Sequence, residues 1–175
     1  MANKDAGLKK NIRMLIVGDS LTAQTIYPND IAILLSQPLN PSWVMLGTEK
    51  SDIAEVGVLH EGYGGWTWNA FLTKYDSESY SKTRAHSPFL YMEYGSPALN
   101  IPRYFRGNCE KNHQMSFFFL LGINDCFHVN PDDFMEVNAK IDEVLDTAEK
   151  LLAAFHTAAP NALLAVGLPP PTQCA

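Results

Sequence analysis

Cysteine is scarce in this chain, and basic residues are outnumbered by acidic ones. Three cysteines among 175 residues, with no Cys-x-x-Cys spacing, exclude a disulfide framework, a zinc knuckle and a dithiol redox site. The formal net charge is −6, which argues against nucleic acid or an anionic membrane as the main partner. No apolar run approaches the roughly 18 residues of a membrane span, and the N-terminus lacks an apolar signal region. We expect a cytoplasmic protein, or a secreted one whose signal has been removed.

Motifs that hold a cofactor are also missing. Residues 62–65 are rich in glycine, but they match neither the P-loop pattern nor the dinucleotide-binding G-x-G-x-x-G pattern. No group of His, Cys, Asp or Glu residues has metal-ligand spacing. The sequence therefore predicts neither a cofactor nor a metal.

The pattern of apolar residues predicts one α/β domain over residues 1–175. Hydrophobic residues make up 46% of the chain and charged residues 18%, as in a globular protein. Short apolar runs predict strands at 14–17, 43–46, 56–59, 116–121 and 162–166. Helices are expected over 28–35, over 67–74, and from an N-cap at Asn130 to a point before Pro160. This alternation favours a flavodoxin-like three-layer α/β/α sandwich with a mostly parallel sheet. Residues 76–110, rich in Ser, Tyr and Pro, are expected to form an irregular insertion or lid.

Two expected strands end in short polar motifs. Gly18-Asp19-Ser20-Leu21 follows the first strand, and Gly122-Ile123-Asn124-Asp125 follows the strand at 116–121. A glycine-rich stretch at 60–66 lies between them in the sequence. Because the carboxyl ends of parallel strands meet at one edge of a sheet, we expect the three segments to converge there.

Such an edge suits acyl transfer, which needs a nucleophile and donors aimed at the developing oxyanion. Ser20 supplies a hydroxyl, and the backbone N–H groups of Ser20 and Gly62, with the side-chain amide of Asn124, supply three donors. A plainer interpretation is also open, since a Ser after a Gly-Asp turn is often a helix N-cap.

These motifs resemble those of the SGNH hydrolases, also called GDSL esterases or lipases. Gly18-Asp19-Ser20-Leu21 is similar to the first family block, Gly62 to the glycine of the second, and Gly122-Ile123-Asn124-Asp125 to the G-x-N-D block. The resemblance spans about residues 11–170, and residues 60–66 look most like the carbohydrate-acetylesterase branch. It implies a serine nucleophile at Ser20 and an oxyanion hole from Ser20, Gly62 and Asn124.

The chain departs from the family at its far end. The family's fourth block, Asp-x-x-His, supplies the base and its orienting acid, and no such block precedes Ala175. We therefore expect a C-terminally incomplete domain without its last strand and helix. Among the histidines on the expected edge, His128 is a better substitute base than His60. A missing strand would leave an unprotected edge beside 162–166, which invites pairing with another chain.

Other residues near the motifs have two interpretations each. Asp19 and Asp125 either hydrogen-bond within their turns or contact the substrate. Trp66 and Trp68 either stack on a sugar ring or pack beneath their own loop. His128 lies four residues after Asn124, close enough to contact a substrate bound there.

The function that the sequence favours is a serine ester hydrolase that removes acyl groups, especially acetyl, from a carbohydrate. One alternative is a carbohydrate-binding pseudo-enzyme, or a fragment that needs a complementary C-terminal segment. A second is a flavodoxin-like nucleotide or phosphate binder, which the absent phosphate-loop glycines and the pI near 5.3 disfavour.

Overall fold

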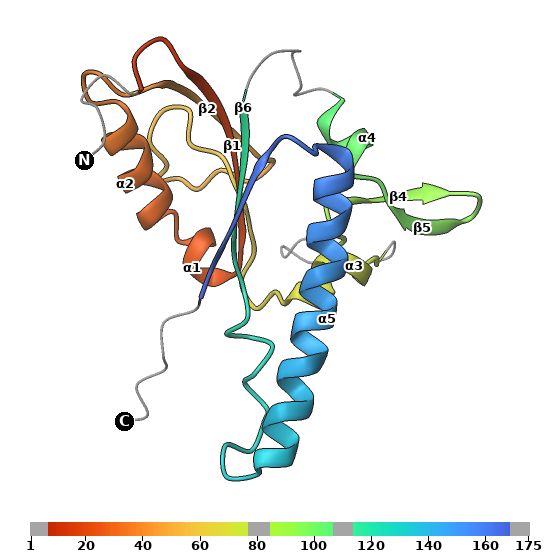
Figure 1. Cartoon of the computed structure of the whole chain (residues 1–175). Coiled ribbons are helices and arrows are strands. Elements are labelled where there is room, and N and C mark those ends of the chain that lie inside the picture. The colour runs from red at the N-terminus through yellow and green to blue at the C-terminus, as the bar shows by residue number, and fades with distance from the viewer. Residues whose placement is uncertain (1–6, 77–84, 107–113, 169–175) are drawn as a thin grey trace.

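A parallel sheet forms the centre of the molecule. The computed structural model describes residues 7–76, 85–106 and 114–168. The strand order is β2-β1-β6-β7, and the short strand β3 pairs with β1 beyond the end of β2 (Figure 1). The strands are β1 (Asn11–Gly18), β2 (Ser42–Leu46), β3 (Glu61–Gly62), β6 (Gln114–Leu120) and β7 (Leu163–Gly167). β1 therefore lies in the interior of the sheet, and its carboxyl end leads directly into the serine motif.

Helices cover both faces of this sheet, so the molecule has three layers. α1 (Ser20–Ala23) and α2 (Ile26–Leu35) lie on one side, and α3 (Trp68–Thr73), α4 (Ile101–Phe105) and α5 (Phe134–Ala158) on the other (Figure 1). Side chains of β1 alternate accordingly: Met14 and Ile16 pack toward α2, whereas Leu15 and Val17 pack toward α5. None of the described helices is long and apolar enough to cross a membrane.

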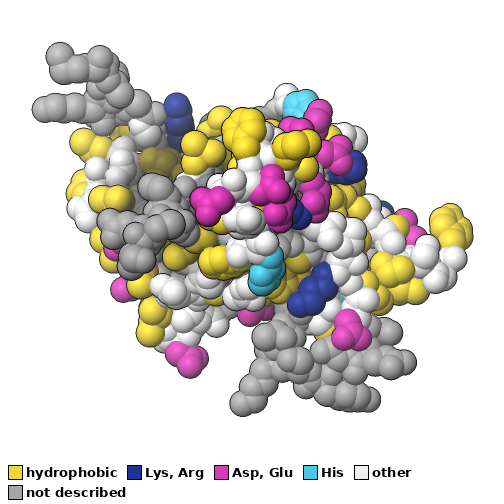
Figure 2. Space-filling model, turned by 90° about the horizontal axis from the view of Figure 1, so that it is seen from below, with side chains coloured by type: hydrophobic (Ala, Val, Ile, Leu, Met, Phe, Trp, Pro, Cys, Tyr) yellow, Lys and Arg dark blue, Asp and Glu magenta, His cyan; other side chains and the backbone are white. Residues whose placement is uncertain are grey.

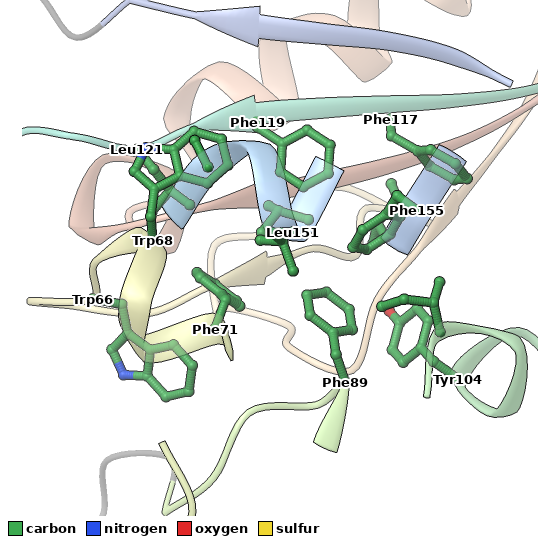
Figure 3. Packing of buried hydrophobic residues seen from close by; sticks show 14 of the residues in the cluster. Trp66, Trp68, Phe71, Phe89, Tyr104, Phe117, Phe119, Leu121, Leu151 and Phe155 are labelled. Atoms are coloured by element: carbon green, nitrogen blue, oxygen red, sulfur yellow. The ribbon is translucent and has the colours of Figure 1, made fainter. Parts of the chain in front are cut away.

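An aromatic cluster joins β6 to α5. Phe155 of α5 meets Phe117, Phe119 and Phe89 edge to face, with ring centroids 5.0–5.2 Å apart (Figure 3). Each such pair adds about 0.5–1.5 kcal/mol beyond the burial of apolar area. The cluster fixes the C-terminal half of α5 against the sheet, where Ala148, Leu151 and Phe155 are the buried residues of this helix.

The expected strand at Val56–Leu59 does not form, and this prediction was wrong. The segment is a turn in which Val58 N–H donates to Glu55 O, and Gly57 has a positive φ of 85°. Val56 is 92% exposed, so only Val58 of the apolar run is buried. The strand that pairs with β1 comes slightly later, at Glu61–Gly62.

The helices also begin elsewhere than expected. α5 is capped by Asp133, whose carboxylate accepts hydrogen bonds from the backbone N–H groups of Met135 and Glu136. Asn130, the expected cap, instead closes a turn whose carbonyl accepts from Asp133 N–H. Likewise α2 begins at Ile26, two residues before Pro28. The short helix α1 was not predicted, and its N-cap is Asp19 rather than Ser20.

The segment expected to be irregular contains regular structure. β4 (Leu90–Glu93) and β5 (Ser96–Leu99) form an antiparallel hairpin, and α4 follows at once. Its hydrophobic residues explain this order, since Phe89, Ile101 and Tyr104 are buried in the aromatic core. Residues 77–84 and 107–113 of the predicted insertion lie outside the described residues.

Candidate active site

Ser20 is the first residue of α1, directly after the turn that ends β1. The buried carboxylate of Asp19 accepts a hydrogen bond from Leu21 N–H at 2.9 Å, which caps the helix. Burial raises the pKa of Asp19, and the bond from Leu21 partly opposes that rise. Ser20 itself is half-buried, and no described residue forms a hydrogen bond with its hydroxyl. The serine hydroxyl therefore sits at the N-terminal end of a capped helix, where backbone N–H groups lack helical partners.

The pairing of β3 with β1 brings Gly62 to the serine turn. Gly62 lies opposite Gly18 in the parallel register, and Tyr63 N–H donates to Gly18 O at 3.1 Å. Thr22 of α1 packs against both glycines, because a Cβ on Gly62 would lie 2.6 Å from Thr22 Cβ. Any side chain at either position would push α1 away from the sheet.

The loop after β6 is tied to the glycine-rich loop. Asn124 Nδ2 donates to Trp66 O at 2.9 Å, and Trp68 N–H donates to Asp125 Oδ1 at 3.2 Å. Burial raises the pKa of Asp125, and the negative charge of Asp19 adds to that rise. β1 and β6 are parallel neighbours, with Gly18 opposite Leu120, so the serine turn and the G-x-N-D turn leave the sheet at the same edge.

The two tryptophans belong to the core. Each is only 3% exposed. Trp66 contacts Tyr63 and Phe71, with ring centroids 4.4 and 4.8 Å apart, and Trp68 stacks on Phe119 at 5.7 Å (Figure 3). The structure therefore places Trp66, a predicted substrate-binding residue, beneath its own loop with almost no exposed ring surface.

Both ring nitrogens of His60 lie within hydrogen-bond distance of a partner. Its Nδ1 accepts a hydrogen bond from Gly62 N–H at 3.1 Å, so the ring proton lies on Nε2. Nε2 is 2.9 Å from Thr25 Oγ1, which in turn donates to Ala23 O. Burial lowers the pKa of His60. Both nitrogens of His60 are therefore engaged with groups other than Ser20, and the Gly62 N–H donates to this imidazole.

His128 lies in the long loop between β6 and α5, where it is exposed. That loop runs beyond the end of the sheet to the start of α5 (Figure 1). Figure 2 views the molecule from this end, where acidic side chains are grouped beside hydrophobic ones. Within the described ranges no imidazole forms a hydrogen bond with Ser20, so the structure brings His128 to the same loop as Asn124 but not to the serine.

Glu61 is a residue that the sequence did not single out. Its carboxylate is fully buried and accepts hydrogen bonds from Thr48, Tyr63 and Tyr104, the last at 2.6 Å. It directly precedes Gly62, so it anchors the candidate oxyanion loop to α4 and to the loop after β2. In the sequence, Glu61 belongs to the glycine-rich stretch at 60–66, and nothing there indicates that its side chain is buried.

In the part of the chain that the structure describes, no cluster of His, Cys, Asp or Glu could hold a metal ion. The groups present at this edge of the sheet are a hydroxyl, backbone N–H groups, a side-chain amide and two buried carboxylates.

Comparison with known proteins identifies one relevant fold. No family model matches the chain, and no curated protein matches its sequence. Among solved structures it is similar to a Clostridium thermocellum family 3 carbohydrate esterase, with a TM-score of 0.55 and 19% sequence identity. The similarity covers 90% of this chain and 61% of the esterase chain, so this chain spans about three-fifths of the esterase's length. The predicted α/β class and mostly parallel sheet are confirmed, and the chain shares the fold of that carbohydrate esterase.

Proposed function

We propose that this chain carries the nucleophile and oxyanion-binding edge of a serine esterase that acts on an acylated carbohydrate. The observation that carries the proposal is the register of β1 with β3. It places Gly62 opposite the serine turn, while Asn124 and Asp125 bind the loop that follows Gly62. The likeness in fold to a carbohydrate esterase supports the substrate class.

In the proposed reaction, Ser20 Oγ adds to the ester carbonyl carbon and its proton passes to a base. The carbon–oxygen bond to the sugar then breaks, and the sugar oxygen takes up the proton. Water adds to the acyl-serine in the same manner, which releases the carboxylic acid, acetic acid for an acetyl ester, and restores the serine.

In this proposal, two donors stabilise the oxyanion. Ser20 N–H is in the first turn of α1, where it has no intrahelical acceptor. Asn124 Nδ2 carries two protons, and the bond to Trp66 O uses one of them. Gly62 N–H becomes a third donor only when the ester displaces His60 Nδ1 from it.

A base that takes the proton of Ser20 distinguishes an active esterase from a pseudo-enzyme. An unassisted serine is a poor nucleophile at neutral pH. Because no described imidazole hydrogen-bonds to Ser20, turnover requires another residue or a movement of the loop that carries His128. That same observation favours a second candidate function, a saccharide-binding pseudo-enzyme that keeps the fold without hydrolysis.

The decisive experiment compares p-nitrophenyl acetate hydrolysis by the chain, by Ser20→Ala and by Ser96→Ala, a control in the exposed β4–β5 hairpin. We expect the Ser20→Ala variant alone to lose turnover and to lose covalent labelling by a fluorophosphonate. In the active chain, Asn124→Ala should lower turnover by about 10²–10³-fold, the usual loss for one oxyanion donor.

Equal hydrolysis by the parent and Ser20→Ala, with no label on Ser20, would exclude the esterase and favour the pseudo-enzyme. Acetate release from acetylated xylo-oligosaccharides then tests the substrate class in any active form. Unchanged turnover in Asn124→Ala would contradict only the oxyanion role of Asn124.

We further propose that β7, which lies at the edge of the sheet, pairs with another chain.

A further inference from the structure

A cavity of about 410 Å³ lies beside the β4–β5 hairpin. It contains none of the candidate active-site residues Ser20, Gly62 and Asn124. Its polar and aromatic lining comes from the loop after β2, from the segments next to residues 75 and 86, from β4 and from α4. The lining includes Thr48, Tyr75, His86, Tyr91, Arg103 and Tyr104.

One wall of the cavity presents hydrogen-bond acceptors. The hydroxyls of Thr48 and Tyr104 donate to the buried carboxylate of Glu61, at 3.0 and 2.6 Å. A hydroxyl has a single proton, so each can only accept any further hydrogen bond. A ligand at this wall must therefore bring donors, and the hydroxyl groups of a sugar are donors of this kind.

Arg103, in another part of the lining, requires an acceptor from the ligand instead of donors. Its guanidinium lies 4.6 Å from the centre of the Tyr91 ring, and the side chain is exposed. No carboxylate in the described ranges forms an ion pair with it. A guanidinium has five donors and no acceptor, and its planar fork matches the two oxygens of a carboxylate. A ligand at this wall must therefore bring an acceptor, preferably an anion.

Three rings, those of Tyr75, His86 and Tyr91, form a further part of the cavity lining. Tyr75 and His86 face each other across an antiparallel bridge, with ring centroids 5.1 Å apart. Together with Tyr91 they provide surfaces against which the C–H face of a pyranose ring can pack. The volume falls within the range of ~300–1,000 Å³ that is typical of small-ligand sites.

We propose that this cavity binds a hexuronic acid residue, a pyranose whose carboxylate meets Arg103 and whose hydroxyls meet Thr48 and Tyr104. The ligand class follows from the cavity's own contacts and does not depend on catalysis by Ser20. Glu61 links the two places, because it holds the acceptor wall and directly precedes Gly62. An esterase with this cavity would favour acylated polysaccharides that carry uronic acid residues.

The test measures binding of three probes by calorimetry or NMR titration: D-glucuronate, D-glucose and acetate. Glucuronate should bind at least about tenfold more tightly than either glucose or acetate, since it alone satisfies both walls. Arg103→Gln should lose about tenfold in glucuronate affinity and leave glucose affinity unchanged. Arg106→Gln, a control on the next turn outside the cavity, should keep both affinities.

Ser20→Ala should bind glucuronate as tightly as the parent chain, which separates this site from the esterase proposal. If Arg103→Gln does not fold, Arg103→Lys keeps the charge and should still lose part of the affinity, because it lacks the planar fork. Absence of glucuronate binding, equal affinity for glucuronate and glucose, or an equal loss in Arg103→Gln and Arg106→Gln would each overturn the proposal.

Discussion

Thr22 fixes the distance between the serine helix and the two strands beneath it. Its side chain is fully buried and its hydroxyl lies 2.6 Å from Tyr27 OH. A Cβ on Gly18 would lie 1.9 Å from Thr22 Oγ1, and one on Gly62 would lie 2.8 Å from Ala23 N. The two glycines are therefore required by packing, independently of any role of the Gly62 N–H in catalysis.

Gly62→Ala should accordingly lower both stability and activity. The added methyl group meets backbone as well as side chain, so α1 must shift, at a cost of about 1–3 kcal/mol. Thermal unfolding and Ser20-dependent ester hydrolysis measure the two effects. Gly64→Ala is the matched control, because no atom lies within 4 Å of its Cβ. Equal melting temperatures for the two variants would contradict this packing role.

His60 makes the fold sensitive to mild acid. Burial lowers the pKa of His60 below its ordinary value, so the unfolded chain takes up a proton before the folded one does. Protonation of Nδ1 would also break the hydrogen bond from Gly62 N–H. The contribution of this group to stability is thus fully present above pH ~6.5 and declines as the pH falls below that value.

Urea unfolding between pH 5 and pH 8 measures this effect. We expect the free energy of unfolding to decrease below pH ~6.5, with a slope of at most ~1.4 kcal/mol per pH unit for one proton. His60→Gln cannot titrate in this range and should remove that slope. The same slope in His60→Gln as in the parent would assign it to other groups.

At the scale of elements, Glu61 connects parts of the chain that are far apart in sequence. Its carboxylate receives Thr48 from the loop after β2 and Tyr104 from α4, while its backbone pairs with β1. A buried polar group is costly unless it is hydrogen-bonded. These hydroxyls therefore satisfy the buried carboxyl group and fix the position of α4 against the β3 loop.

Tyr104→Phe should destabilise the chain by about 1–3 kcal/mol, the usual cost of removing one partner of a buried hydrogen bond. Chemical denaturation measures the change, and Tyr94→Phe, on a fully exposed ring, is the control. In a Glu61→Ala background the effect of Tyr104→Phe should shrink, because the acceptor of its hydrogen bond has been removed. Additive effects of the two substitutions would argue against a direct coupling.

Elements with a strong local signal were predicted well. β1 and β6 are continuous apolar runs, and the apolar residues of α5 recur at helical spacing up to Phe155. The start of α5 was missed because Asn130 and Asp133 are both good caps, and only the fold decides between them. Val56–Leu59 has a strand-like composition, but Gly57 adopts a left-handed conformation that ends any strand.

At the scale of the whole molecule, the meeting of three loops at one sheet edge follows from sequence, because parallel strands share one direction. The contacts that set the geometry at this edge cannot be predicted from the sequence in the same way. The bond from Gly62 N–H to His60 joins neighbours, yet it depends on Thr25 holding the ring from across the loop. Similarly, Trp66 is buried by Phe71 of α3 as well as by Tyr63 of its own loop.

β7 lies at one edge of the sheet in the described chain, and β2 lies at the other. β7 pairs with β6 on one side, and no described strand pairs with its other side. Leu163 and Val166 are each about half exposed. An apolar groove of about 590 Å³ runs between α5 and β7, lined by side chains that include Leu152 and Val166. Free backbone groups beside apolar side chains are a template for pairing with another strand.

We therefore expect this chain to self-associate through β7 in a concentration-dependent manner, which sedimentation velocity measures. Val166→Lys places a charge at the edge and should lower the association constant by about tenfold or more, equivalent to ~1.4 kcal/mol. Val56→Lys adds the same charge on a loop where the side chain is 92% exposed, and it should leave association unchanged. A chain that stays monomeric at every concentration, or an equal response to both substitutions, would contradict pairing at this edge, because a general change in net charge would then explain the result equally well.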